Sequence, residues 1–400
     1  MKILLNGYME LIPRSGKESW TGTRIFTKEL VKYCHAHGHT FSGLILRAGI
    51  PDDSYTVKRY KDKNSAWLVA QLRLNPTLIL HTGLSRLSEL SKRPIEIITE
   101  IIKAEKPDVI LLNGFMLTSW FMLKAAQKAG IPVVSSHHGI WTKEVAQIVN
   151  KYSPIMNPLA RFMEKDLTKL STAEIFLNDH TRRAYEKAVT KTNPSRRVII
   201  PIKYDESFLN KRLPRPRNEQ PIRIGFVGRW DPIKNIQAVY DLAAEARRQK
   251  KDWEFYSVTK IDDLKTLAPL RGKYEKLIRV IPGLSPKELK KFYADMDLMI
   301  LPSRFDAAGI VVMEAAFQNR ATLISLGVGW VEEYEKCGMK DWIDSFADPK
   351  KALAHIERLL GSDVPAAYIS HIKKYHAPQR IIEAYFKVLR RAARSKASKN

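Results

Sequence analysis

Two cations follow a buried, glycine-containing strand pattern in the second half of the chain. The segment ends in Gly228-Arg229, and Lys234 follows where a helix is expected to begin. A glycine at a strand end lets the backbone approach a ligand closely. Guanidinium and ammonium groups beside a helix N-terminus favour phosphate oxygens. The spacing therefore predicts a diphosphate site, although two surface cations near a turn would give the same pattern.

Two carboxylates follow a later strand. Asp306 ends the segment LPSRFD, and Glu314 lies inside the apolar helix IVVMEAA. Ala307, Ala308 and Gly309 are expected to leave backbone N–H groups open at the start of that helix for hydroxyls or phosphate oxygens. A charge in so apolar a helix needs a partner, so Glu314 is a candidate to accept hydrogen bonds from paired hydroxyls of a ligand. The alternative is a capping Asp306 and a Glu314 on a solvated face.

The histidines and cysteines do not form a metal-ligand pattern. His137 and His138 are adjacent at the end of an apolar strand, where successive side chains point to opposite faces. Cys34 and Cys337 are far apart in sequence, without the Cys/His spacing of a zinc site. We therefore expect no zinc site. His138 remains a candidate site residue, with a purely structural histidine as the alternative.

Short apolar runs alternate with helical patterns along the whole chain. Strands are expected at residues 2–5, 40–46, 109–113, 133–136, 175–177, 198–201, 222–227, 254–258, 278–281, 298–301 and 322–325. Helices are expected at residues 24–37, 236–248, 286–294, 310–318 and 349–360, and throughout 366–392. This alternation predicts an α/β protein with parallel sheets covered by helices on both faces. In such doubly wound sheets, ligands bind beyond the carboxyl ends of the strands.

The polar segment NKRLPRPRNEQP, with its three prolines, is typical of a linker. A chain of 400 residues is also too long for one ordinary core. We predict a first domain at residues 1–210 and a second at 211–375. Residues 376–400 are expected to form a C-terminal helix with a basic, disordered tail.

The chain is strongly basic, with a net charge of +25 spread over both halves. A DNA-binding arm would concentrate its charge, so no nucleic-acid partner is expected. An even basic excess suits anionic small substrates or an anionic membrane face. The stretches 58–74 and 159–170 could lie on such a membrane, or else pack as helices on their own sheet. The N-terminal apolar run is too short for a secretory signal. A cytoplasmic location is therefore predicted, with peripheral contact to the inner membrane face as an addition.

The order of these motifs resembles that of the retaining glycosyltransferases of family 4. VGRWDPIKN and LPSRFDAAGIVVMEAA are similar to the family's Gly-Arg…Lys-Gly element, Pro-Ser element and two spaced glutamates. Lys2–Asn6, Thr21-Gly22-Thr23 and His138-Gly139 follow the family's order in the first half. The resemblance implies the GT-B fold, with two Rossmann-like domains facing a cleft and the C-terminal helix packed back on the first domain.

The resemblance also implies roles for single residues. Arg229 and Lys234 would hold the donor diphosphate and stabilise its leaving charge. Glu314 would bind the ribose hydroxyls, and Asp306, where the family has glutamate, would lie by the donor sugar. The remaining implied contacts are Gly22 and Gly228 with the phosphates, Ala307, Ala308 and Gly309 with sugar hydroxyls, His138 with sugar and acceptor, and Pro282 and Gly283 with the base.

The resemblance thus implies a hexosyl transfer with retention of anomeric configuration. The donor would be a UDP- or GDP-sugar, and the acceptor a glycan, a lipid-linked molecule or a small molecule. The resemblance also implies that neither a metal nor a cofactor is needed. A sugar phosphorylase or a nucleotide-sugar epimerase on the same fold is the alternative. A non-enzymatic nucleic-acid-binding protein is suggested only by the charge.

Overall fold

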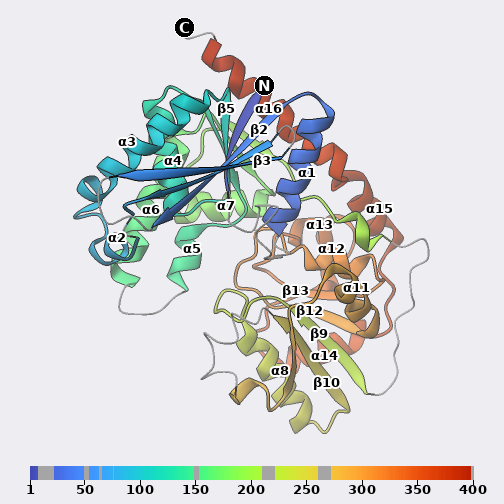
Figure 1. The fold of residues 1–400 in the computed structure, drawn as a ribbon. Coiled ribbons are helices and arrows are strands. Elements are labelled where there is room, and N and C mark those ends of the chain that lie inside the picture. The colour runs from blue at the N-terminus through green and yellow to red at the C-terminus, as the bar shows by residue number, and fades with distance from the viewer. Residues whose placement is uncertain are drawn as a thin grey trace. The chain divides into compact units, whose positions relative to one another are not determined.

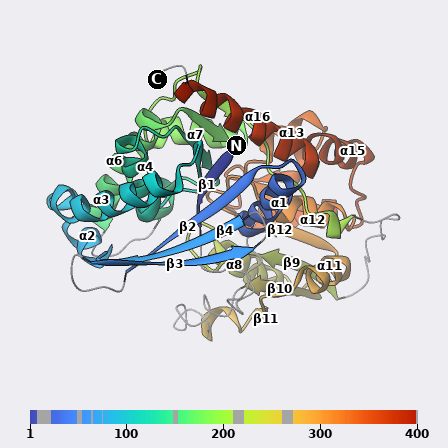
Figure 2. The same ribbon diagram turned by 45° about the horizontal axis from the view of Figure 1, so that its top comes forward.

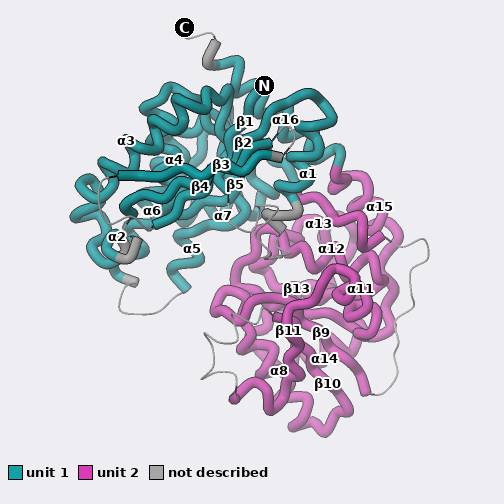
Figure 3. Tube along the Cα trace, viewed as in Figure 1, with its two compact units in different colours: residues 1–201, 379–400 teal, residues 202–378 magenta. Residues whose placement is uncertain are grey.

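The computed structural model describes residues 1–7, 22–48, 54–62, 65–74, 76–147, 153–209, 221–259 and 272–397. The chain forms two compact units, Met1–Pro201 with Gln379–Asn400 and Ile202–Pro378 (Figure 3). Each unit is a sheet covered by helices (Figure 1). The expected linker at 210–221 lies almost entirely outside the described residues.

The first unit holds an eight-stranded sheet in the order β3-β4-β2-β1-β5-β6-β7-β8. Its neighbouring strands pair in parallel, except for the antiparallel pair β3 and β4. The strands are β1 (Lys2–Asn6), β2 (Thr40–Ala48), β3 (Tyr55–Asp62), β4 (Ser65–Leu72), β5 (Val109–Asn113), β6 (Val133–His137), β7 (Ala173–Phe176) and β8 (Arg197–Ile199).

The strands β3 and β4 correct the prediction for residues 58–74, which form no helix. They run side by side at one edge of the sheet (Figure 2). The apolar run of β4 is largely buried beside β2, and such a run cannot be told from a buried helix by periodicity alone. Residues 54–61 are exposed, and their lysines suit an edge strand because they oppose pairing with another chain.

Helices cover both faces of this sheet. Leu4 faces a core shared with α3 (Leu87–Glu105), α4 (Leu117–Lys128) and α6 (Ser153–Leu170). Ile3 and Leu5 face the opposite core, formed with α1 (Gly22–Ala36) and α16 (Pro378–Ala397). The other helices of the unit are α2 (Pro76–Thr82), α5 (Trp141–Ala146) and α7 (Asp179–Ala188).

Two helical predictions have distinct outcomes. The stretch 159–170 is the C-terminal part of α6, and its Leu159, Met163 and Leu167 are buried in the unit's own core. The stretch 366–392 is not one helix but two, α15 (Ala366–Tyr375) and α16, because a new helix begins at Pro378. Proline cannot continue a helix interior but suits a helix start.

Among the described residues, no helix is both long and apolar enough to span a membrane.

The second unit holds a parallel six-stranded sheet in the order β11-β10-β9-β12-β13-β14. In chain order this is the Rossmann arrangement, which reverses direction between its first and fourth strands, here β9 and β12. The strands are β9 (Ile222–Val227), β10 (Trp253–Thr259), β11 (Ile278–Pro282), β12 (Leu298–Leu301), β13 (Thr322–Ser325) and β14 (Ile343–Asp344).

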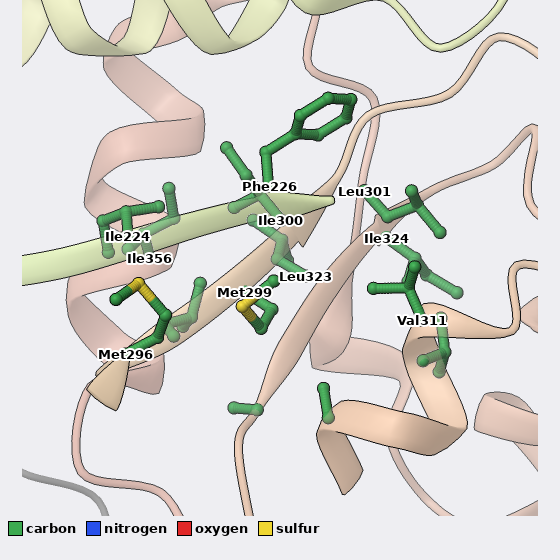
Figure 4. Close-up of a cluster of buried hydrophobic side chains, with 14 of the residues drawn as sticks. Ile224, Phe226, Met296, Met299, Ile300, Leu301, Val311, Leu323, Ile324 and Ile356 are labelled. Atoms are coloured by element: carbon green, nitrogen blue, oxygen red, sulfur yellow. The ribbon is translucent and has the colours of Figure 1, made fainter. Parts of the chain in front are cut away.

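The core of this unit fixes the central strands. Ile224 and Phe226 of β9, Met299 of β12 and Leu323 of β13 pack with Ile356 of α14 (Figure 4). The helices of the unit are α8 (Ile236–Arg248), α11 (Pro286–Asp295), α12 (Val311–Ala316), α13 (Val331–Lys336), α14 (Pro349–Leu359) and α15. The loops that leave β9 and β12 are therefore held on buried, rigid strands.

Candidate functional site

The loops after β9 and β12 meet where the strand order of the second unit reverses. Arg304 N donates to Ile233 O at 2.8 Å, and Asn235 Nδ2 donates to Pro302 O at 3.1 Å. Lys234 Nζ lies 2.5 Å from Asp306 Oδ2. In open α/β sheets this switch point is the usual ligand site. The structure thus brings together the diphosphate motif and the carboxylate motif of the sequence.

Asp231 organises the loop after β9, and the sequence analysis missed it. Its Oδ1 accepts the backbone N–H of Lys234 at 2.8 Å, and its Oδ2 lies 3.1 Å from Arg229 Nη2. One carboxylate therefore positions both cation-bearing residues. The signal was available as the Asp-Pro dipeptide between a strand and a helix, which favours a turn.

Arg229 and Lys234 differ in exposure. The Arg229 side chain is 51% exposed, whereas that of Lys234 is 19% exposed. Gly228, between β9 and Arg229, donates its N–H to Val258 O at 3.0 Å. The buried Trp230 donates its indole N–H to Ser257 Oγ at 2.7 Å, which fixes the loop to β10. The site therefore combines an accessible guanidinium with an ammonium held close to the sheet.

Asn235 stands where the family pattern described above has the glycine of its Lys-Gly element. It stands at the N-cap of α8 with φ of 57°, in the left-handed region. Glycine adopts this conformation without strain, and asparagine tolerates it better than most residues. The Lys-Asn pair therefore permits the backbone turn for which the family's Lys-Gly is suited.

Asp306 has partners for both carboxylate oxygens. Its Oδ2 pairs with Lys234, and its Oδ1 accepts the N–H groups of Ala308 at 3.3 Å and Gly309 at 2.9 Å. The expectation of open N–H groups is therefore wrong for Ala308 and Gly309, because the neighbouring aspartate caps them. Burial alone would raise the pKa of Asp306, but the Lys234 ammonium and the two N–H donors outweigh it and lower that pKa.

The loop at 306–309 is bound to the loop after β13. Asp306 N donates to Gly327 O at 2.9 Å, and Gly329 N donates to Asp306 O at 2.8 Å. The buried Trp330 donates its indole N–H to the carbonyl oxygens of Ala308 and Gly309. These contacts fix the carboxylate loop from the side of β13, whereas Lys234 contacts Asp306 from the side of β9. Sequence reasoning did not identify Trp330, because its partners become neighbours only in the fold.

Glu314 lies buried in α12, with 8% of its surface exposed. Tyr293 of α11 donates its hydroxyl to Glu314 Oε2 at 2.7 Å. Burial raises the pKa of Glu314 to about 7, the Tyr293 hydrogen bond opposes this, and the charge of Asp205 adds to it. The alternative of a solvated face residue is therefore wrong, and the carboxyl titrates near neutrality.

This titration predicts a pH-dependent stability. The folded-state pKa lies above 4.5, the ordinary pKa of a glutamate, so the native protein binds more protons than the unfolded chain between those two values. Stability from this group is therefore full below pH 4.5 and is lost as the pH rises to about 7. The loss is about 3 kcal/mol. The Glu314→Gln variant should lack this decline in thermal unfolding measured from pH 5 to 8; a parallel decline in both proteins would contradict it.

Pro282 ends β11 and Gly283 follows it, and both residues are exposed. The end of β11 pairs in register with the end of β10, since Pro282 lies opposite Thr259. The two residues are therefore at the same carboxyl edge of the sheet as Gly228, two strands along from β9.

The first unit contributes His138, directly after β6. The half-buried ring has its Nε2 3.1 Å from Ser136 Oγ and its centroid 5.9 Å from that of Phe26. The pKa of His138 is lowered to about 4, mainly by burial and to a smaller extent by the charge of the neighbouring His137. The imidazole is therefore neutral at physiological pH. Gly22 begins α1, whose fifth residue is Phe26.

His137 has a separate environment. Its Nε2 lies 3.2 Å from Glu174 Oε1, and its ring stacks on Phe176 at 4.2 Å. The adjacent histidines thus contact different groups, as expected from their opposite directions. No group of three or more His, Cys, Asp or Glu that could hold a metal ion occurs among the described residues.

A buried glutamate anchors the segment that follows His138. Glu164 of α6 accepts the N–H groups of Trp141 at 2.8 Å and Thr142 at 2.9 Å, the first two residues of α5. Burial raises the pKa of this carboxyl. Glu164 was not singled out in the sequence, because only the fold places it beside the start of α5.

Two family models match the chain in tandem. The family described as Glycosyltransferase Family 4 matches residues 20–205, and the family described as Glycosyl transferases group 1 matches residues 208–385. The Bacillus subtilis glycosyltransferase YqgM is 20% identical over 279 residues, which cover 66% of this chain and 73% of that protein.

Solved structures share the fold over the whole chain. Sucrose-phosphate synthase from Thermosynechococcus elongatus has a TM-score of 0.70 and 16% identity, with 98% of each chain covered. A UDP-forming α,α-trehalose-phosphate synthase from Burkholderia xenovorans has a TM-score of 0.68 and 12% identity, covering 98% of this chain and 99% of that one. The two family matches, in this order on a GT-B fold, identify the chain as a family 4, group 1 glycosyltransferase.

Proposed function

We propose that this enzyme transfers a hexosyl group from a nucleoside-diphosphate sugar and binds the diphosphate with Arg229 and Lys234. The observation that carries the proposal is the contact between Lys234 and Asp306 at the switch point. It joins a cation suited to phosphate with a carboxylate suited to sugar hydroxyls in one place. Both cations would stabilise the charge that develops on the leaving diphosphate.

The rest of the donor fits along the carboxyl edge of the same sheet. Glu314, once ionised, would accept hydrogen bonds from the ribose hydroxyls. Neighbouring strands are about 4.8 Å apart, so the end of β11 is roughly 10 Å from the end of β9. That span suits a nucleoside whose base contacts the backbone at Pro282 and Gly283. Gly22, at the start of α1, is the proposed contact of the first unit with the phosphates.

The acceptor is proposed to bind the first unit near His138, as a glycan, a lipid-linked molecule or a small molecule. The exposed strand β3 carries Lys58 and Lys61 beside Tyr55 and Tyr60. Basic and aromatic side chains together suit the headgroups of an anionic membrane. The proposal therefore includes peripheral contact with the inner membrane face. It also includes a cytoplasmic location, which suits the two free cysteines because that compartment keeps thiols reduced.

Incubation with UDP- and GDP-sugars tests the proposed reaction. UDP-sugars come first because a structural relative is named as UDP-forming. The expected result is release of one nucleoside diphosphate and, by NMR, a product with the anomeric configuration of the donor. Inversion would contradict retention. A reaction that needs phosphate but no nucleotide would indicate a phosphorylase instead, and an altered free nucleotide sugar would indicate an epimerase.

A further inference from the structure

A chain of hydrogen bonds runs from the C-terminal helix to His138. The Tyr385 hydroxyl of α16 lies 2.7 Å from Ser136 Oγ, and Ser136 Oγ lies 3.1 Å from His138 Nε2. Tyr385 is 1% exposed and Ser136 is 2% exposed. Both are therefore shielded from water, and each hydrogen in the chain needs a protein acceptor.

The packing of α16 fixes the position of the phenol. Ile382, Phe386 and Leu389 lie in the same buried cluster as Tyr385, at helical spacing along one face. The Phe26 ring lies 4.6 Å from the Tyr385 ring and 5.9 Å from the His138 ring, between centroids. The aromatic contacts leave the phenol and the imidazole little freedom to turn.

Counting hydrogens decides which groups donate. Among the described residues, Ser136 Oγ is the hydrogen-bond partner of the Tyr385 hydroxyl, and Tyr385 and His138 are the side-chain partners of Ser136. If Tyr385 donates to Ser136 and Ser136 donates to His138 Nε2, every hydrogen has an acceptor. If instead His138 donates from Nε2, either the serine or the tyrosine hydrogen is left buried without one. A buried hydrogen without an acceptor destabilises the native state, so the first arrangement is favoured.

An accepting Nε2 determines the other ring nitrogen. A neutral imidazole carries one hydrogen, so Nδ1 must be the donor. The ring is neutral at physiological pH because burial holds the pKa of His138 at about 4. The ring is only half-buried, and its Nδ1 makes no hydrogen bond with a described residue. Nδ1 is therefore available to a ligand.

We propose that Ser136, whose hydroxyl is held by Tyr385, is a positioning residue that keeps His138 in the Nδ1–H tautomer. His138 then offers a hydrogen-bond donor to a sugar or phosphate oxygen and does not act as a general base. The relevance of that donor to transfer rests on the proposed function. The tautomer itself does not, since it follows from contacts within the first unit.

Long-range 1H–15N NMR of the histidine rings tests the proposal directly, because it reports which nitrogen carries the hydrogen. The His138→Gln variant identifies the signal. We expect the Nδ1–H form in the unaltered protein, and an increased Nε2–H fraction in Ser136→Ala, which removes the hydroxyl that donates to Nε2. Tyr385→Phe leaves the Ser136 hydrogen with His138 Nε2 as its acceptor, so the Nδ1–H form should persist in that variant. An Nε2–H form in the unaltered protein, or an unchanged tautomer in folded Ser136→Ala, would overturn the proposal.

A matched control separates this effect from loss of stability. Tyr334 of the second unit is also buried and donates its hydroxyl to Thr322 O at 3.1 Å. Tyr334→Phe should also lose stability and leave the His138 tautomer unchanged. Where transfer is measurable, Ser136→Ala should lower kcat about tenfold without changing the affinity for the nucleoside diphosphate. An unchanged kcat in a variant with an altered tautomer would remove the donor role of His138.

Discussion

Replacing Lys234 with methionine is expected to lower the rate of sugar transfer about 10²–10³-fold. Methionine keeps most of the side-chain volume but removes the ammonium that lies 2.5 Å from Asp306. The developing charge on the leaving diphosphate then loses a fixed cation in a partly buried place. Steady-state kinetics with the best donor found would measure the effect.

Loss of the cation also leaves a carboxylate without its ionic partner. The Asp306 side chain is only 14% exposed, so the single variant should lose about 3 kcal/mol of unfolding free energy. Adding Asp306→Asn to Lys234→Met removes the unpaired charge and should recover most of that stability without recovering transfer. Lys251→Met serves as the matched control, because Lys251 pairs with Glu357 outside the candidate site. Full activity in Lys234→Met would refute the diphosphate role.

Asp306→Asn alone is expected to shift binding and turnover in opposite directions. The amide oxygen can still accept the N–H groups of Ala308 and Gly309, so the loop should keep its conformation. Lys234 is no longer neutralised, and the diphosphate meets one negative charge fewer. Affinity for a nucleoside diphosphate should therefore rise about tenfold, an effect of roughly 1–2 kcal/mol.

Turnover in Asp306→Asn should fall about 10–100-fold, because the carboxylate that orients the donor sugar and Lys234 has lost its charge. Calorimetry of nucleotide binding and transfer kinetics measure the two effects separately. If Asp306 is only a cap for its own loop, neither quantity will change. Weaker nucleotide binding in a folded variant would show that the aspartate attracts the donor instead of competing for Lys234.

Much of the second unit could be predicted because its strands are continuous apolar runs with polar boundaries. The expected strands at 222–227, 298–301 and 322–325 agree with β9, β12 and β13. The strands β3 and β4 could not be predicted in this way. An edge strand rich in lysine has weak alternation, and a buried strand such as β4 resembles a helical segment in its composition.

The candidate site was predictable as a set of residues but not as a set of contacts. Lys234 and Asp306 were identified from their positions after strands. Sequence could not show that Asp306 caps Ala308 and Gly309, because that depends on the local backbone conformation. Nor could it show that Tyr385 reaches Ser136, which lies 249 positions earlier in the chain. Such contacts arise from tertiary packing, which local patterns do not encode.

A paired titration of UDP or GDP against the corresponding nucleoside tests the central claim most directly. Calorimetry would compare the unaltered protein with an Arg229→Ala, Lys234→Met double variant, checked for folding by circular dichroism. The diphosphate site predicts that the double variant loses at least tenfold in affinity for the nucleoside diphosphate, while its affinity for the nucleoside stays the same. Equal losses for both ligands, or no loss for either, would contradict diphosphate binding at the switch point.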